Sequence, residues 1–425
     1  MQKLWVRNLA ALCAAQLLTL IGFSSYLPFV PFFVQELGVE SYDAAVAWSA
    51  AFSSGAAVAM MVFQPIWGVL ADRVGRKPML IRATAAGAVL AFSMSFARTP
   101  EMLVVIRVLQ GMFCGTVAAA LTLVASETPD AEMGFALGLM QTAQFVGNAI
   151  GPLLGGTISD AYGARTVFWV SSALMAVSVM LILLGVREGR KPEPSQHAIS
   201  LRPMFTGMRQ VVRGSSAVLL GALASVSFGA MVVSPILSLY VQSLAPNAPN
   251  LGTLAGSVTA ASSVTSSAAA FLLGRAGDRL GQRRVLIVCV FGGAALFFPQ
   301  AMVRSPYALL AIRALQGAFM GGVLPTANAL LARMTPSSRR GSVFGLASSL
   351  QAGGRAIGPM VGAAAAGAWT MGSSFVVAGA VFLAIGLGVL LFVHPPSGQE
   401  AKALPPELSA KPATAGASGC SSPST

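Results

Sequence analysis

The stretch Gly68–Leu80 reads GVLADRVGRKPML and lies between two long apolar runs. It carries one carboxylate (Asp72), three cations and two glycines. A related stretch, Gly274–Leu286, reads GRAGDRLGQRRVL in the same setting, 206 residues later. Because the most charged turn of the chain recurs at about half its length, the sequence predicts two copies of one structural unit.

The composition indicates an integral membrane protein. Apolar residues make up 55% of the 425 residues and charged residues only 10%, whereas soluble domains carry about 25% charged residues. The net charge of +13 does not indicate a nucleic-acid partner, because the cations lie in short turns between apolar segments. The sequence contains no metal-ligand spacing, nucleophile elbow or phosphate loop, so neither an enzyme nor a cofactor or metal site is predicted.

The apolar segments are long enough to cross a bilayer twelve times, since one helical span needs about 20 residues. The spans are predicted within residues 8–35, 44–70, 78–96, 102–126, 133–158, 166–186, 214–274 (two spans, divided at 243–252), 285–303, 306–332, 341–366 and 373–393. We therefore predict an all-α integral membrane fold of twelve transmembrane helices in two pseudo-symmetric six-helix bundles. The bundles comprise residues 1–186 and 215–393, with a cytoplasmic linker at 187–214 and a disordered tail at 394–425.

The repeat extends into the helices. RVLQG, starting at Arg107 in the fourth span, matches RALQG, starting at Arg313 in the tenth, and Gly151-Pro152 matches Gly358-Pro359. Two similar halves place a binding site near the midplane between them, where the halves can rock.

The distribution of cations predicts the orientation. With the amino terminus inside, 21 of the 27 Lys and Arg residues fall in cytoplasmic segments. Only three, Arg98, Arg165 and Arg304, fall in segments on the outer side of the membrane. The positive-inside rule then predicts a multi-pass membrane protein with both termini in the cytoplasm.

Three motifs carry a family resemblance. They are the loop Gly68–Leu80, the fourth-span motif R-x-x-x-G-x-x-x-G at Arg107–Gly115, and GNAIGPLLGG at Gly147–Gly156 in the fifth span. With these motifs, residues 4–394 resemble the twelve-helix drug:proton antiporters of the major facilitator superfamily, in particular the MdtG-type multidrug exporters of bacteria.

The resemblance implies a function. The expected activity is secondary active efflux of drug-like or amphipathic small molecules by alternating access, coupled to protons as the antiported partner, in a monomer embedded in the lipid bilayer. A sugar or metabolite exporter of the same superfamily stays open as an alternative, and so does a non-transporting membrane scaffold or receptor.

The resemblance also implies a latch at the cytoplasmic side. Asp72 is expected to face the start of the eleventh span near Gly341, and Asp278 the start of the fifth span near Gly134. A carboxylate is stabilised there by the positive end of the helix dipole. Further expected gating residues in these loops are Gly68, Arg73, Arg76 and Arg279. For the cations, a role in topology alone is the alternative.

Within the spans, Gly147, Gly151 and Pro152 are predicted gating residues on the fifth helix. The glycines there recur every four residues, and small-residue stripes permit close helix contact in lipid. Gly252, Gly256 and Ala260 form a comparable stripe on the eighth span. Arg107 is implied by the resemblance to act in proton coupling, with helix packing as the alternative.

Five residues are predicted to bind substrate: Gln144, Phe145, Asn148, Gln351 and Arg355. A cavity-facing Arg355 would disfavour cationic drugs, whereas in the alternative it binds a helix-end carbonyl or a lipid phosphate. All fourteen acids lie at span ends, in loops or in the tail, unlike the deep carboxylate of many related antiporters. The proton carrier therefore stays open among Asp72, Glu127, Asp130 and Glu132.

Overall fold

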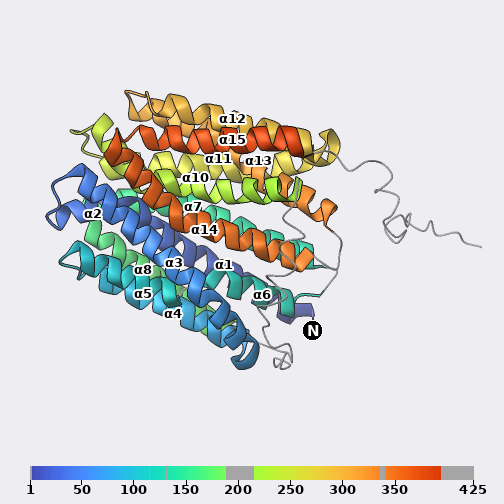
Figure 1. Ribbon diagram of the computed structural model, residues 1–425. Coiled ribbons are helices and arrows are strands. Elements are labelled where there is room, and N and C mark those ends of the chain that lie inside the picture. The colour runs from blue at the N-terminus through green and yellow to red at the C-terminus, as the bar shows by residue number, and fades with distance from the viewer. Residues whose placement is uncertain (1, 114, 130–131, 188–214, 336–339, 394–425) are drawn as a thin grey trace, which may run out of the picture. The chain divides into compact units, whose positions relative to one another are not determined.

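A computed structural model describes residues 2–113, 115–129, 132–187, 215–335 and 340–393. These residues form helices joined by short loops, with no strand among them, which confirms the predicted all-α class (Figure 1). The helices of the first half are α1 (Gln2–Tyr26), η1 (Leu27–Phe29), α2 (Val30–Glu36), α3 (Tyr42–Val74), α4 (Arg76–Met94), α5 (Pro100–Phe113), α6 (Thr116–Glu127), α7 (Met133–Tyr162) and α8 (Ala164–Gly185). Those of the second half are α10 (Ser215–Leu244), α11 (Leu251–Leu280), α12 (Gln282–Gln300), α13 (Pro306–Met334), α14 (Arg340–Ala368) and α15 (Ser373–Phe392).

The helices follow the order of the predicted spans. In the described part of the chain, eight helical stretches are long and apolar enough to cross a membrane. The other predicted spans correspond to α4, which begins with two cations, to the short pair α5 and α6, and to the glycine-rich α7 and α14. α5 and α6, with 14 and 12 residues, are each too short to span alone. The small residues of α7 and α14 lower their hydropathy and suit close contact with other helices.

The fourth span is not the continuous helix predicted over 102–126. It divides between α5 and α6, next to Gly115, whose φ of +137° is a conformation that side chains rarely adopt. Two carbonyls at the end of α5 have partners: Trp67 Nε1 donates to Met112 O at 2.6 Å and Arg82 Nη2 to Phe113 O at 3.4 Å. Because an unpaired carbonyl is costly within a membrane, these two side chains make the break tolerable.

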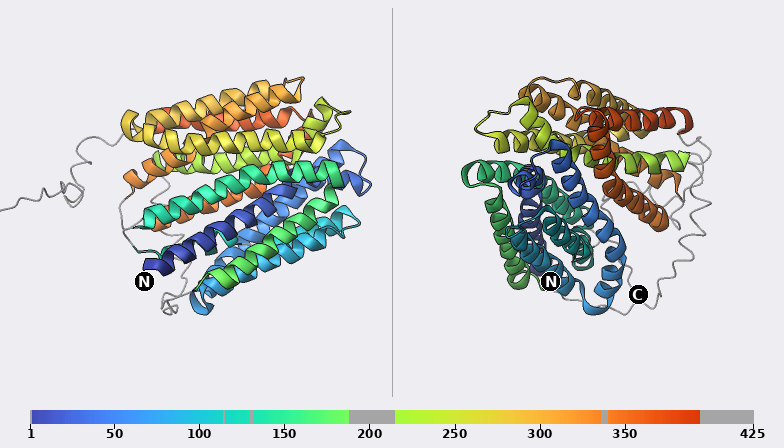
Figure 2. Two further views of the ribbon diagram at one scale, coloured as in Figure 1. Left: turned by 180° about the vertical axis from the view of Figure 1, so that it is seen from behind. Right: turned by 60° about the vertical axis from the view of Figure 1, so that its left-hand side comes forward.

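One large hydrophobic cluster contains buried residues of both halves, and two helix pairs make most of the contacts between the halves. Residues 1–393 form one compact unit. Within the first half α1 packs on α7 and α8, and within the second half α11 packs on α13 and α10 on α14. Contacts between the halves come mainly from α7 with α11 and from α3 with α14, as Figures 1 and 2 show.

The repeated charged loop closes the end of each half in the same way. Lys77 Nζ donates to Leu183 O at 3.1 Å and Val186 O at 2.7 Å, at the end of α8. Its counterpart Arg283, 206 residues later, donates to Leu390 O at 2.8 Å and to Val393 O, at the end of α15. Each cation thus satisfies carbonyls at the negative end of a helix. We call the helix ends around these two loops the basic end, and the far ends of the helices the opposite end.

A glycine makes each of these loops possible. Gly75 ends α3 with φ +110° and ψ +154°, and Gly281 ends α11 with φ +93° and ψ +126°. These backbone angles are accessible to glycine and strained for other residues. The glycine lets the chain turn directly into the next helix, so that Lys77 and Arg283 reach their carbonyls.

We predict that Gly75→Ala lowers the free energy of unfolding by about 1–3 kcal/mol, the cost of such a backbone conformation in a residue with a Cβ. The matched control is Gly353→Ala, a helical position at which a Cβ meets nothing within 4 Å. That change should be neutral or slightly stabilising, because alanine favours helix more than glycine does. Thermal unfolding of the purified variants in detergent measures both effects. Equal changes in melting temperature for the two variants would show that the backbone conformation of Gly75 does not require glycine.

Candidate functional site

The two halves meet through a carboxylate of the first half that caps a helix of the second. Asp160, in the last turn of α7, accepts hydrogen bonds from the Gly252 and Thr253 N–H groups, each at 2.7 Å. The Thr253 hydroxyl donates to the same carboxylate at 2.6 Å. Since α11 begins at Leu251, these N–H groups have no partner within the helix, and the dipole favours an anion there.

Small residues bring the two helices into backbone contact beneath this cap. A Cβ on Gly156 of α7 would lie 2.5 Å from Gly252 O, and one on Gly256 of α11 would overlap Pro152 O. Neither helix could carry a larger side chain at these points without moving apart. We call this contact, made by Pro152, Gly156, Asp160, Gly252 and Gly256, the seam.

The predicted glycine stripe on α7 faces a neighbour in its own half. A Cβ on Gly147 would lie 2.8 Å from Leu20 Cβ of α1, and one on Gly151 would overlap the Ser24 side chain. Ser24 Oγ also donates to Gly147 O at 3.0 Å. Gly147 and Gly151 therefore hold α7 on α1, whereas Pro152 of the same motif reaches α11. A gating role for these residues stays a prediction.

Arg107 lies in a buried polar network that joins α1, α4 and α5. Its Nη1 donates to Tyr26 OH at 2.6 Å and to Gln110 Oε1. Gln110 in turn donates to Gly87 O at 3.1 Å and accepts from Tyr26 OH at 3.0 Å. The guanidinium also lies 4.9 Å from the centre of the Phe52 ring, so neutral oxygens and an aromatic face surround this cation.

The second half repeats this network with one difference. Arg313 Nη1 donates to Gln316 Oε1 at 3.5 Å, and Gln316 Nε2 to Gly293 O at 3.4 Å. Where Tyr26 meets Gln110 in the first half, Gln300 donates to Gln316 Oε1 at 3.0 Å in the second. Both arginines thus help to pack the helices of their own half. Arg107 also bonds directly to Tyr26 of α1.

The structure does not describe the side chains of several predicted gating residues. Gly68, Asp72 and Arg73 belong to α3 and Asp278 to α11, but their side chains are not described. The same holds for the proposed counterparts Gly134 and Gly341. Arg76 is half-buried at the start of α4, and Arg279 is exposed in the last turn of α11. The cytoplasmic latch stays a prediction.

The predicted substrate residues lie on two helices that pack against different neighbours. Gln144, Phe145 and Asn148 are on α7, next to α1 and α11, whereas Gln351 and Arg355 are on α14, next to α10 and α3. Asn148 and Arg355 are exposed and the other three are half-buried. The five residues thus lie on one helix of each half, and their role in substrate binding stays a prediction.

Two buried side-chain amide nitrogens have no hydrogen-bond partner among the described residues. They are Gln144 Nε2 on α7 and Gln16 Nε2 on α1. Both lie at one level of the α1–α7 contact, because Cys13 meets Met140 one turn below and Leu20 meets Gly147 one turn above. A buried donor without a partner costs about 1–3 kcal/mol, so this pair is available to an acceptor on a bound molecule.

The sequence does not predict the role of Asp160, because its partner is remote in the chain. The sequence places it at the end of a span but does not show which helix that end faces. One signal was present: Asp160 is the only charged residue from Met133 to Tyr162. A lone acid at the end of an otherwise uncharged helix is a candidate cap for another helix, and here it caps the first turn of α11.

We predict that Gly156→Leu separates α7 from α11 and lowers the melting temperature, because the new side chain would overlap the backbone at Gly252 and Thr253. Gly138→Leu is the matched control on the same helix, since a Cβ there meets nothing within 4 Å. Thermal unfolding in detergent compares the two variants. A Gly156 variant as stable as the Gly138 variant would show that the seam is not closely packed.

Comparisons with known proteins agree with this architecture. The model of the Major Facilitator Superfamily matches residues 12–254 and 219–418. Multidrug resistance protein MdtG of Salmonella arizonae is 31% identical over 379 residues, which cover 89% of this chain and 93% of that protein. MdtG of Klebsiella pneumoniae is also 31% identical over 379 residues, 89% of this chain and 92% of that protein.

Two solved structures share the fold at lower sequence identity. The crystal structure of the nucleoside transporter NupG has a TM-score of 0.73 at 13% identity and covers 90% of this chain and 98% of its own. That of the human organic anion transporter MFSD10 has a TM-score of 0.66 at 18% identity, with 91% and 99% covered. Family match, relatives and fold agree: the chain belongs to the Major Facilitator Superfamily and is a multi-pass membrane protein.

Proposed function

We propose that this protein exports drug-like or amphipathic small molecules by proton-coupled antiport, with alternating access to the two sides of a bacterial cytoplasmic membrane. The similarity to MdtG multidrug resistance proteins supports the substrate class. The cation distribution supports an orientation with both termini in the cytoplasm. The cap of Asp160 on α11 is the observation that carries the mechanism.

Alternating access needs contacts between the halves that can break and re-form. The Asp160 cap is such a contact, because a carboxylate and two N–H groups can each bind water when they separate. It lies at the opposite end, as does the hydrogen bond from Ser238 Oγ to Pro28 O, which also joins the halves. We infer that the described conformation is closed at the opposite end, which faces outward in the proposed orientation.

The cytoplasmic latch would act in the other conformation. Asp72 and Asp278 stand at the basic end, where they would cap α14 and α7 after the halves rock. The same interaction, an acid at a helix N-terminus, would then hold each end shut in turn. A cap contributes about 0.3–1 kcal/mol when exposed and more when partly buried, which suits a reversible gate.

The substrate would be bound between the halves and against the unpaired amides. Gln16 and Gln144 offer donors inside the first half. Phe145, Asn148 and Gln351 offer aromatic and polar surface nearby on α7 and on α14. A few donors among apolar residues suit molecules that differ in shape but share an acceptor.

Arg107 would act as a positioning residue in proton coupling. Its bond to Tyr26 at 2.6 Å links α5 to the point where α1 gives way to η1. A shift of α1 during rocking would therefore move the guanidinium. The carboxylate that carries the proton stays open among Asp72, Glu127, Asp130 and Glu132.

Dye flux into inverted vesicles tests the function. We predict uptake of a lipophilic dye that requires a proton gradient and falls at least tenfold in Asp72→Asn, with normal insertion. Asp43→Asn is the control, since Asp43 is an exposed acid in the first turn of α3. Gradient-independent flux would contradict antiport, and no flux of any drug would contradict export.

Asp160→Asn should weaken closure at the opposite end. The amide lacks the negative charge and replaces one acceptor by a donor, so the bonds to Gly252 and Thr253 cannot all re-form. Because Asp160 is exposed, we predict a loss of about 0.3–1 kcal/mol in stability, as for an exposed charge at a helix N-terminus. Glu40→Gln, at an exposed site on the same side, should leave the melting temperature unchanged. Equal melting temperatures of the two variants would show that Asp160 does not stabilise the start of α11.

Arg355→Ala should change substrate preference. If the exposed guanidinium of α14 lies near bound substrate, its removal takes away repulsion of cations, and we predict improved export of cationic relative to neutral dyes. Arg304→Ala is the control, because Arg304 is exposed in the loop before α13. An unchanged ratio would place Arg355 away from the substrate path.

A further inference from the structure

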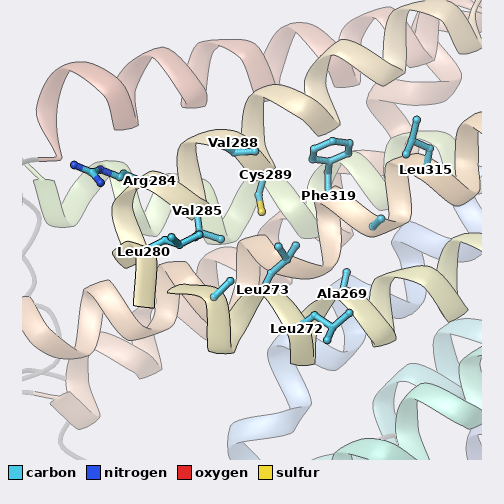
Figure 3. A pocket seen from close by; sticks show the side chains of 12 residues that line it. Ala269, Leu272, Leu273, Leu280, Arg284, Val285, Val288, Cys289, Leu315 and Phe319 are labelled. Atoms are coloured by element: carbon cyan, nitrogen blue, oxygen red, sulfur yellow. The ribbon is translucent and has the colours of Figure 1, made fainter. Parts of the chain in front are cut away.

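We propose that the groove between α11, α12 and α13 binds an anionic phospholipid, with one acyl chain in the groove and the phosphate at Arg284. The groove has a volume of about 540 Å³. Figure 3 shows it from close by, with Arg284 at one end and Leu315 at the other.

The groove exists because small residues form part of its lining. Ala269 and Ala276 of α11 and Ala318 of α13 leave room between larger neighbours. The rims are apolar and exposed: Leu272 and Leu280 are each 63% exposed, and Val288 is 60% exposed. A wholly apolar surface of this kind in a membrane protein faces hydrocarbon, so the occupant must be apolar where it touches the walls.

The length of the groove fits one leaflet. It follows α11 from Ala269 to Leu280, which at 1.5 Å per residue is about 16 Å. Half of a hydrocarbon core is about 15 Å thick. The groove starts at the basic end and stops near the middle of α13, so an acyl chain that enters from the headgroup region would fill it.

The charge at the mouth selects an anion. Arg284 is exposed, and no hydrogen-bond or ion-pair partner of its guanidinium is found among the residues that the structure describes. Its neighbour Arg283 is different, because it is bound to carbonyls of α15. Arg279 is exposed in the last turn of α11, and Arg275 lies 4.1 Å over the Phe271 ring. Several cations at headgroup level favour anionic over zwitterionic lipid.

This inference does not depend on the transport proposal, because it needs only that the protein resides in a bilayer. Binding can therefore be measured without any transported substrate. Native mass spectrometry of the full chain, released from detergent with added phosphatidylglycerol or phosphatidylcholine of identical acyl chains, measures it directly.

We expect the wild type to retain phosphatidylglycerol in preference to phosphatidylcholine. Arg284→Gln should reduce the apparent affinity for phosphatidylglycerol about fivefold and leave that for phosphatidylcholine unchanged. Ala276→Phe, which fills the groove, should weaken both lipids. The control Arg7→Gln removes an exposed cation from the first half and should change neither.

Two results would overturn the proposal. The first is equal retention of the two lipids by the wild type, which would show that Arg284 does not select a phosphate. The second is an unchanged lipid profile in both Arg284→Gln and Ala276→Phe, which would place any bound lipid elsewhere. Melting temperatures of the same samples verify that each variant is folded.

Discussion

A carboxylate at the end of one helix caps the first turn of another, and this contact joins the two halves of the protein. Asp160 satisfies two backbone N–H groups and one hydroxyl of α11. In a membrane, unpaired backbone groups at a helix start must find a partner or water. The contact can form only because Gly156 and Gly256 let the two backbones approach. Closure at this end therefore depends on both charge and the absence of side chains.

The same physical requirement explains the repeated charged loops. A helix that ends at the membrane surface leaves carbonyls without partners. In each half a cation that follows a left-handed glycine, Lys77 or Arg283, supplies the missing donors. The loop motif thus ends one helix and binds its cation to the end of another. Because the transporter is built from two similar halves, this contact between a loop cation and a helix end occurs in each of them.

Much of the fold was predictable from the sequence, because hydropathy and repetition act locally. The all-α class and the order of the spans are confirmed, and the Gly252–Gly256 stripe does lie on the seam. The break beside Gly115 was not predicted, since nothing local shows that Trp67 and Arg82 would satisfy the exposed carbonyls. Asp160 was missed for the same reason: its role depends on a helix start 92 residues away in sequence. Contacts of this kind are set by packing between helices that are remote in sequence, and no local sequence pattern predicts them.

We propose that the Asp160 cap opens and closes as the halves rock. Spin labels at Tyr162 and Asn250, exposed positions beside the cap on the two sides of the seam, report the separation by pulsed electron–electron resonance. The account predicts a short-distance population in the resting protein and a longer one that grows when transport conditions, drug plus proton gradient, are imposed in liposomes. A single short distance that no drug, gradient or Asp160→Asn change alters would contradict it.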